Sequence, residues 1–195
     1  MKVKVCGITN LEDAEMCELM GADALGFVNF QGRTRSLPVE KISDICSSVG
    51  PTVTKVLVCA PTSAHEGLRM LERSGADAVQ LHSLSPEDID EMRASGASVM
   101  RVVHPIREEA VLFAQCSDAL VFEDGIPGTG SSYDYSQIPF DVHPRCIIAG
   151  GLNAQTVDLA KSLNPYGVDV SSGVERVPGR KDPELVQEFI RRCRA

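Results

Sequence analysis

The sequence predicts an α/β fold, a single (β/α)8 barrel in which eight parallel strands are each followed by a helix or a lean loop. Three observations predict it. Apolar strand-like runs alternate with helix-like segments along the whole chain. A pattern that joins a helix end to a strand occurs four times. The last two strands run into small hydrogen-bonding residues, at 150–153 and 171–173, which is typical of a phosphate site in such a barrel.

Short apolar runs without alternation predict strands that are buried on both faces. The eight strands are expected at 3–5, 24–28, 53–58, 78–81, 98–103, 119–122, 146–149 and 168–170. The copies of the recurring pattern lie at 21–28, 75–82, 117–122 and 167–170. In the first two copies Gly21 and Gly75 end a helix, and the strand follows after a turn.

Apolar spacing of helical period fills the gaps between the strands, in several places behind a Thr, Ser, Asn or Asp cap. Helices are expected at 11–20, 39–49, 64–74, 86–94, 108–115, 154–163 and 183–193. The sixth crossover, 125–140, shows little helical period, so we expect a loop there with at most a short helix. Nothing divides the chain, and residues 1–195 are expected to form one domain that is short for a barrel of typically about 250 residues.

A doubly wound open sheet would also alternate strands and helices, but no Gly-x-Gly-x-x-Gly follows the first strand. The net charge of −8 disfavours nucleic acid and anionic membrane surfaces as partners. No signal peptide or membrane span is recognisable, so a soluble, cytoplasmic protein is expected. The seven cysteines lack Cys-x-x-Cys spacing, which argues against a disulfide framework and against a metal site.

Chemistry in a barrel takes place at the C-terminal ends of the strands. Cys6 ends the first strand, where the N-terminus of the following helix would lower the pKa of its thiol and favour a base. The alternative is a buried structural cysteine.

Asp124 follows the sixth strand, where a partly desolvated carboxyl group keeps its proton near neutral pH. Its neighbour Glu123 is the competing acid, because only one of two successive side chains points into the barrel. The alternative is that both are solvated loop carboxylates.

Arg35, in the loop after the second strand, offers a planar fork to a carboxylate, with Arg33 as the second candidate. His82 ends the fourth strand and is expected to support substrate binding rather than act as the base. The backbone around Gly128 and Gly130 is expected to form an N–H concavity for phosphate. Further substrate contacts are expected from the last two strand ends, at Gly150, Gly151, Asp169, Ser171, Ser172 and Gly173.

Six motifs, in this order and spacing, together resemble the phosphoribosylanthranilate isomerase family of tryptophan biosynthesis, from Lys4 to about Phe189. They are Lys4-Val5-Cys6-Gly7-Ile8-Thr9-Asn10, Gly26-Phe27-Val28 followed by Arg35, Gln80-Leu81-His82, Pro127-Gly128-Thr129-Gly130, Ala149-Gly150-Gly151-Leu152-Asn153, and Asp169-Val170-Ser171-Ser172-Gly173-Val174-Glu175.

The resemblance implies a barrel isomerase without cofactor that acts on a phosphorylated small molecule. Its reaction is the Amadori rearrangement of N-(5-phosphoribosyl)anthranilate to 1-(2-carboxyphenylamino)-1-deoxyribulose 5-phosphate. Cys6 would be the general base, Asp124 the general acid, and Arg35 the residue that binds the anthranilate carboxylate. The chain departs from the family pattern around Asp124, which Glu123 precedes and Gly125 follows.

Two other interpretations remain open at this point. Another phosphate-binding barrel isomerase, such as an aldose–ketose isomerase of histidine biosynthesis or a pentose-phosphate epimerase, would carry aspartates at both catalytic strand ends or a metal site, and Cys6 argues against it. A non-catalytic barrel that only binds a phosphorylated ligand would tolerate replacement of Cys6 and Asp124.

Overall fold

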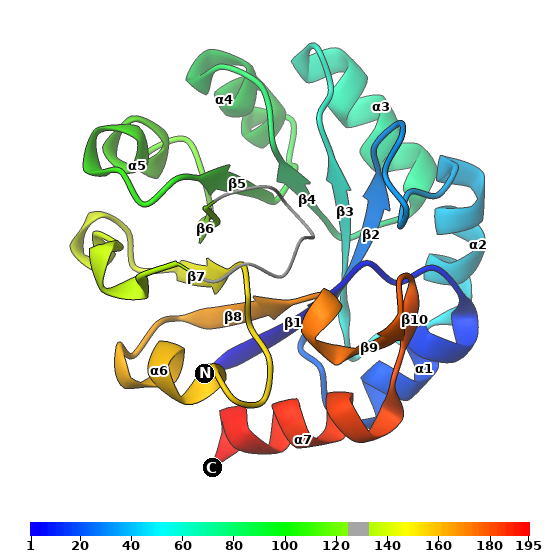
Figure 1. Ribbon diagram of the computed structural model, residues 1–195. Helices are drawn as coiled ribbons and strands as arrows, with labels where there is room; N and C mark the ends of the chain where they lie inside the picture. Colours follow the sequence, from blue (N-terminus) through cyan, green and yellow to red (C-terminus); the bar gives the residue numbers. More distant parts are fainter. Residues whose placement is uncertain (125–132) are drawn as a thin grey trace.

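The protein is a closed eight-stranded parallel barrel surrounded by helices, as Figure 1 shows in a view into the barrel. The computed structural model describes residues 1–124 and 133–195. The strands pair in sequence order, and β1 closes the barrel by pairing with both β2 and β8. The strands are β1 (Lys2–Cys6), β2 (Ala24–Asn29), β3 (Thr54–Cys59), β4 (Ala78–Leu81), β5 (Val99–Val103), β6 (Ala119–Phe122), β7 (Cys146–Ala149) and β8 (Gly167–Val170). The predicted (β/α)8 fold is confirmed.

The helices follow the predicted order. They are α1 (Leu11–Leu19), α2 (Val39–Ser48), α3 (Ala64–Ser74), α4 (Pro86–Ala94), α5 (Arg107–Ala114), α6 (Val157–Ser162) and α7 (Pro183–Arg194). Four of them begin behind a side chain that accepts a backbone N–H of the first turn, from Asn10, Ser63, Ser85 and Asp182. No helix within residues 1–124 and 133–195 has the length and apolar character needed to cross a membrane.

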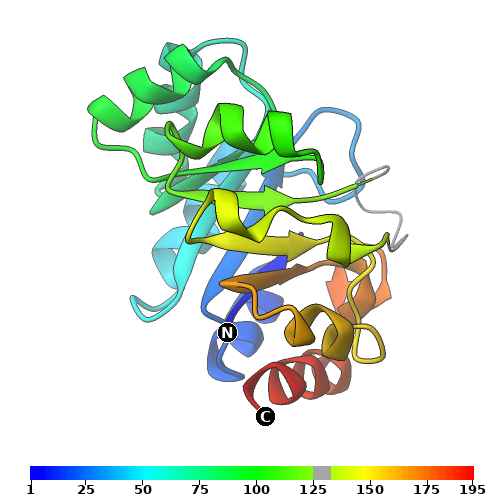
Figure 2. The ribbon, with the colours of Figure 1, turned by 90° about the vertical axis from the view of Figure 1, so that its left-hand side faces the viewer.

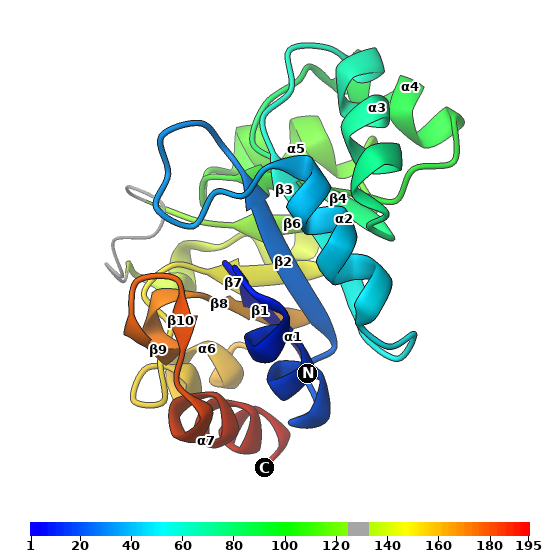
Figure 3. The ribbon, with the colours of Figure 1, turned by 90° about the vertical axis from the view of Figure 1, so that its right-hand side faces the viewer.

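The described part of the sixth crossover contains only two short 3-10 turns, η1 (Tyr135–Gln137) and η2 (Phe140–Val142), so the expected weak helix is confirmed there. An antiparallel hairpin of β9 (Glu175–Val177) and β10 (Arg180–Lys181), which the sequence did not predict, follows β8 and the 3-10 turn η3 (Ser172–Val174). Figures 2 and 3 show this hairpin and the loop after β2 at the end of the barrel to which the strand arrows point.

Alternation along each strand divides the core into two layers. Side chains that point outward, such as Val3 and Val5 on β1, pack beneath the helices in the main apolar cluster. Side chains that point inward form two small clusters inside the barrel, one around Val56 and Val58 and the other around Val121 and Ile147. The inward positions closest to the C-terminal ends of the strands therefore face the barrel mouth, where the candidate site lies.

Candidate active site

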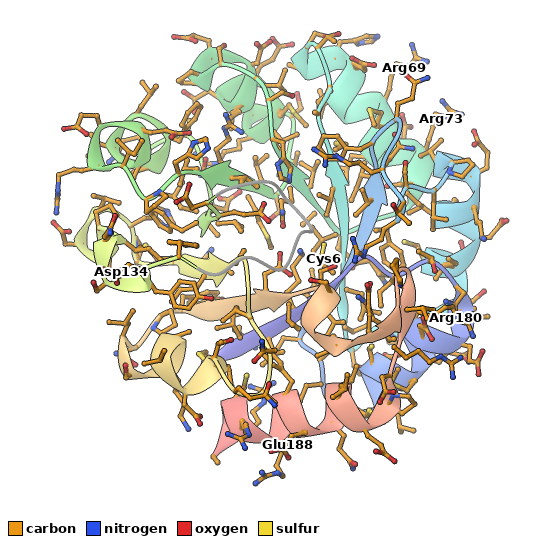
Figure 4. All side chains as sticks on the ribbon, viewed as in Figure 1. Cys6, Arg69, Arg73, Asp134, Arg180 and Glu188 are labelled. Carbon is orange, nitrogen blue, oxygen red and sulfur yellow. The ribbon has the colours of Figure 1, made fainter. Side chains whose placement is uncertain are left out.

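Cys6 is half-buried at the end of β1, and its side chain points inward on the same face of the strand as Lys4. Figure 4 shows Cys6 near the centre of the view into the barrel. A Cβ atom on Gly26 of β2 would lie 2.6 Å from Cys6 Sγ and 3.0 Å from Lys4 Nζ. Glycine is therefore needed at position 26, because it leaves room for the thiol and the ammonium beside the β2 backbone.

Lys4 forms a buried ion pair with Asp169 of β8, with 2.7 Å between Lys4 Nζ and Asp169 Oδ2. The two residues are direct neighbours in the β1–β8 ladder, which places their side chains side by side inside the barrel. The second carboxylate oxygen, Asp169 Oδ1, is buried without a hydrogen-bond partner among the described residues. A buried acceptor in this state is available to a hydroxyl group of a ligand.

The expectation that the pKa of Cys6 is lowered is wrong. Burial raises the pKa of the thiol above its ordinary value and outweighs the opposing positive charges of Lys4 and Lys181. The helix that was expected to lower it begins only at Leu11, beyond the loop that follows Cys6. Cys6 is nevertheless the only half-buried cysteine, since the other six are buried free thiols.

Arg35 lies at the mouth in contact with Glu175 of β9 through one edge of its guanidinium group. Arg35 Nε donates to Glu175 Oε1 at 2.8 Å and Arg35 Nη2 donates to Glu175 Oε2 at 2.6 Å. The remaining edge, formed by Nη1 and Nη2, is the one that a ligand carboxylate can use. Gly7, at φ +76°, allows this arrangement, because a Cβ there would lie 2.5 Å from Arg35 Cδ.

Lys181 of β10 connects these groups to the ends of two barrel strands, and no sequence motif indicated this residue. Its Nζ donates to the carbonyl oxygen of Cys6 at 2.6 Å and to that of Ser171 at 3.1 Å, and it contacts Glu175 Oε1 at 2.9 Å. Burial favours the neutral form of Glu175, but Arg35 and Lys181 hold its pKa below the ordinary value. The carboxylate thus stays charged and fixes the position of both basic groups.

His82 is half-buried after β4, and its ring meets Phe30 edge-on with 5.1 Å between the ring centroids. Burial lowers the pKa of His82 to about 4, with contributions from the positive charges of Lys4, Arg101 and Arg33. The imidazole is therefore neutral at physiological pH. The two nearly perpendicular rings form an aromatic contact beside the mouth.

The two carboxyl groups after β6 differ in environment. Glu123 is half-buried and continues the inward positions Ala119 and Val121, whereas Asp124 is exposed and continues the outward ones. Burial and the negative charge of Asp169 raise the pKa of Glu123 to about 7. A carboxyl group of this kind holds a proton near neutral pH and is able to donate it.

The loops after β7 and β8 pack against each other. A Cβ on Gly173 would overlap the carbonyl oxygen of Leu152. Gly150 and Gly151 both have positive φ, +87° and +67°, and Tyr135 donates a hydrogen bond to the carbonyl oxygen of Gly150 at 2.6 Å. Half-buried Ser171 and Ser172 complete this region.

The structure thus brings Cys6, Asp169, Arg35 and Ser171 together around the mouth, and it groups Gly150, Gly151, Ser172 and Gly173 in the adjoining loops. Gly128 and Gly130 lie outside the described residues. Lys4, Glu175 and Lys181 were missed. The only sequence signal for Lys4 is a charged residue at an inward position of a buried strand, two residues before Cys6.

Comparison with known proteins identifies the family of the chain. The family model of N-(5'phosphoribosyl)anthranilate (PRA) isomerase matches residues 3–192. The chain is 36% identical over 205 residues to the N-(5'-phosphoribosyl)anthranilate isomerase of Methanothrix thermoacetophila, with 100% of this chain and 98% of the relative covered. It is 36% identical over 204 residues to that of Thermotoga neapolitana, with the same shares covered.

Solved structures agree with the sequence comparison. The phosphoribosyl anthranilate isomerase of Thermotoga maritima superimposes with a TM-score of 0.91 at 32% identity, covering 100% of this chain and 98% of that one. A phosphoribosyl anthranilate isomerase in complex with reduced 1-(o-carboxyphenylamino)-1-deoxyribulose 5-phosphate has a TM-score of 0.88 at 31% identity, with the same coverage. The fold and these matches over nearly its full length show that the chain belongs to the N-(5'phosphoribosyl)anthranilate (PRA) isomerase family.

Proposed function

We propose that this chain catalyses the Amadori rearrangement of N-(5-phosphoribosyl)anthranilate to 1-(2-carboxyphenylamino)-1-deoxyribulose 5-phosphate. The observation that carries the proposal is the pairing of a half-buried thiol, Cys6, with a carboxyl group of raised pKa, Glu123, on inward positions of the same barrel. A base and an acid facing one ligand are what an aldose–ketose rearrangement requires.

The acid acts first in this scheme. Glu123 donates its proton to the furanose ring oxygen while the bond from C1 to that oxygen breaks, and the lone pair of the anilino nitrogen forms the C1=N⁺ bond of an iminium. We assign this role to Glu123 in preference to Asp124, because Glu123 occupies the inward position and its pKa of about 7 lets a substantial fraction of it carry a proton near neutral pH.

The base acts second. The Cys6 thiolate removes the proton from C2, and the electrons of that C–H bond form the C1=C2 bond of an enolamine while the nitrogen regains its lone pair. Loss of the proton from the C2 hydroxyl and protonation of C1 then give the ketose. General acid and base groups each contribute typically about 10²–10⁴ in rate, and fixing both ends of the substrate contributes further.

The remaining residues bind the substrate. We assign the carboxylate to the free edge of Arg35 and the anthranilate ring to the surface of Phe30 and His82. Asp169 Oδ1 accepts a ribose hydroxyl. The phosphate lies against the loops after β7 and β8, at Gly150, Gly151, Ser171, Ser172 and Gly173, with the segment around Gly128 and Gly130 as a further contact.

Support for a phosphorylated small-molecule ligand comes from the relative that was crystallised with a reduced deoxyribulose 5-phosphate compound. The net charge of −8 disfavours a nucleic-acid partner. Seven free thiols fit the reducing cytoplasm, which we propose as the location of the reaction.

The proposal is tested by mixing the purified protein with freshly generated phosphoribosylanthranilate and following the anthranilate-type fluorescence. Rapid loss of fluorescence, with the carboxyphenylamino ketose phosphate identified as the product, is the expected result. A protein that binds phosphate ligands but leaves the substrate unchanged would refute the assignment and return the chain to the class of binding barrels.

A further inference from the structure

A buried ammonium group lies next to the thiol of Cys6 inside the barrel. Lys4 is 4% exposed and stands two residues before Cys6 on the same face of β1. Lys4 Nζ and Cys6 Sγ both lie close to Gly26. A Cβ atom at this glycine would lie 3.0 Å from the nitrogen and 2.6 Å from the sulfur. The absence of a side chain at position 26 thus lets the two groups approach each other.

Asp169 holds this ammonium in place. Its Oδ2 lies 2.7 Å from Lys4 Nζ, and both side chains are almost completely buried. Burial alone would lower the pKa of Lys4, but the charges of Asp169 and Cys6 raise it above the ordinary value. Lys4 therefore remains an ammonium group, although it is surrounded by protein.

The other charged groups around Cys6 contact atoms other than its thiol. Lys181 of β10 binds the carbonyl oxygen of Cys6, and it shares the carboxylate of Glu175 with Arg35 from the loop after β2. Glu123 after β6 and His82 after β4 also feel this pair, because Asp169 raises and Lys4 lowers the pKa of Glu123, and Lys4 lowers that of His82. Lys4 is thus the cation whose side chain itself approaches the thiol.

We propose that Lys4 is a positioning residue that stabilises the Cys6 thiolate, and that Asp169 fixes the Lys4 ammonium beside Sγ while its own negative charge limits the effect. The inference rests on the proposed function only where it names Cys6 as the base. It identifies the group that most strongly opposes the rise that burial causes in the pKa of this thiol.

The test measures the rate at which iodoacetamide alkylates Cys6 as a function of pH, with the Cys6 peptide quantified by mass spectrometry. No substrate is involved, so the result does not depend on the isomerase reaction. The variants are Lys4→Met and Asp169→Asn. The matched control is Lys2→Met, which removes a lysine and an ion pair from the same strand and face, at the opposite end from the mouth.

Removal of the cation in Lys4→Met is expected to shift the alkylation profile by about one pH unit or more toward higher pH. The alkylation of Cys6 at neutral pH then becomes about tenfold slower. Asp169→Asn is expected to shift it downward, since Lys4 stays tethered beside the thiol and loses its compensating charge. Lys4→Arg keeps the profile near that of the parent, and Lys2→Met leaves it unchanged.

An unchanged profile in Lys4→Met, or upward shifts of similar size in both Lys4→Met and Asp169→Asn, would overturn the proposal, because the pair would then be structural. If Lys4→Met alone does not fold, the neutral pair Lys4→Met/Asp169→Asn is compared with Asp169→Asn. The alkylation profile of the double variant must then lie at least one pH unit higher than that of Asp169→Asn. Equal profiles refute the proposal. Isomerase activity that is absent from the parent while these shifts occur would refute the proposed function and leave the Lys4 assignment standing.

Discussion

Glu123 and Asp124 are neighbours in the chain, but only Glu123 has the burial that an acid catalyst needs. We expect Glu123→Gln to lower turnover by about 10²–10⁴, because the amide cannot protonate the ring oxygen. Asp124→Asn, which changes an exposed carboxylate, should retain most of the turnover. Steady-state kinetics of the two isosteric variants decides between them, and the reverse order of effects would return the role to Asp124.

The raised pKa of Glu123 also predicts a pH-dependent stability. The ordinary pKa of 4.5 applies to the unfolded chain, and the folded value is about 7. Between these values the folded state binds more protons, so the free energy of unfolding decreases as pH rises through that range. Ionised Glu123 thereby destabilises the fold by at most about 3 kcal/mol above pH 7.

Urea unfolding of the parent and Glu123→Gln at pH 5 and pH 8 tests this. The two proteins should be similar in stability at the lower pH, and the variant should be the more stable one at the higher pH. A stability difference that is the same at both pH values would show that Glu123 titrates normally.

The contact between the loops after β7 and β8 depends on Gly173. Its Cβ would overlap the carbonyl oxygen of Leu152. We expect Gly173→Ala to destabilise the fold by about 1–3 kcal/mol through overpacking and to weaken inhibition by inorganic phosphate.

Gly96→Ala is the control for this substitution. Gly96, at φ +94°, has nothing within 4 Å of its Cβ position, so alanine costs only the strained backbone, about 1 kcal/mol, far from the phosphate loops. Urea unfolding and phosphate inhibition are measured for both. Unchanged phosphate inhibition in Gly173→Ala would mean that the packing of these loops does not shape the phosphate site.

Most elements were predictable because strand and helix patterns are local. The strands β4, β6 and β7 and the helices α3 and α4 have the predicted limits. The helix expected at 154–163 is shorter, because Asn153 Oδ1 accepts the backbone N–H groups of Gln155 and Thr156 and holds these residues in a turn. The β9–β10 hairpin was missed, since its short polar strands lack an apolar alternation.

The fold and the family were predictable from the sequence, and both are confirmed. The prediction rested on the order of the motifs and on the small residues that follow the last two strands. The pairings that define the site were not predictable, because barrel closure creates them. Lys4 and Asp169 are 165 positions apart, and Arg35 and Glu175 are 140 apart. The pKa of Cys6 is raised chiefly by burial inside the closed barrel, with a further contribution from the negative charge of Asp169, and a local sequence pattern does not show that burial.

Cys6 is proposed as the base that acts at C2 of phosphoribosylanthranilate. The most direct test compares Cys6→Ala with the parent in turnover at saturating substrate and in affinity for reduced 1-(o-carboxyphenylamino)-1-deoxyribulose 5-phosphate. We predict that turnover falls by about 10²–10⁴ while the affinity stays close to that of the parent. Turnover that is unchanged, or that falls only as far as the affinity does, would contradict the assignment of Cys6 as the catalytic base.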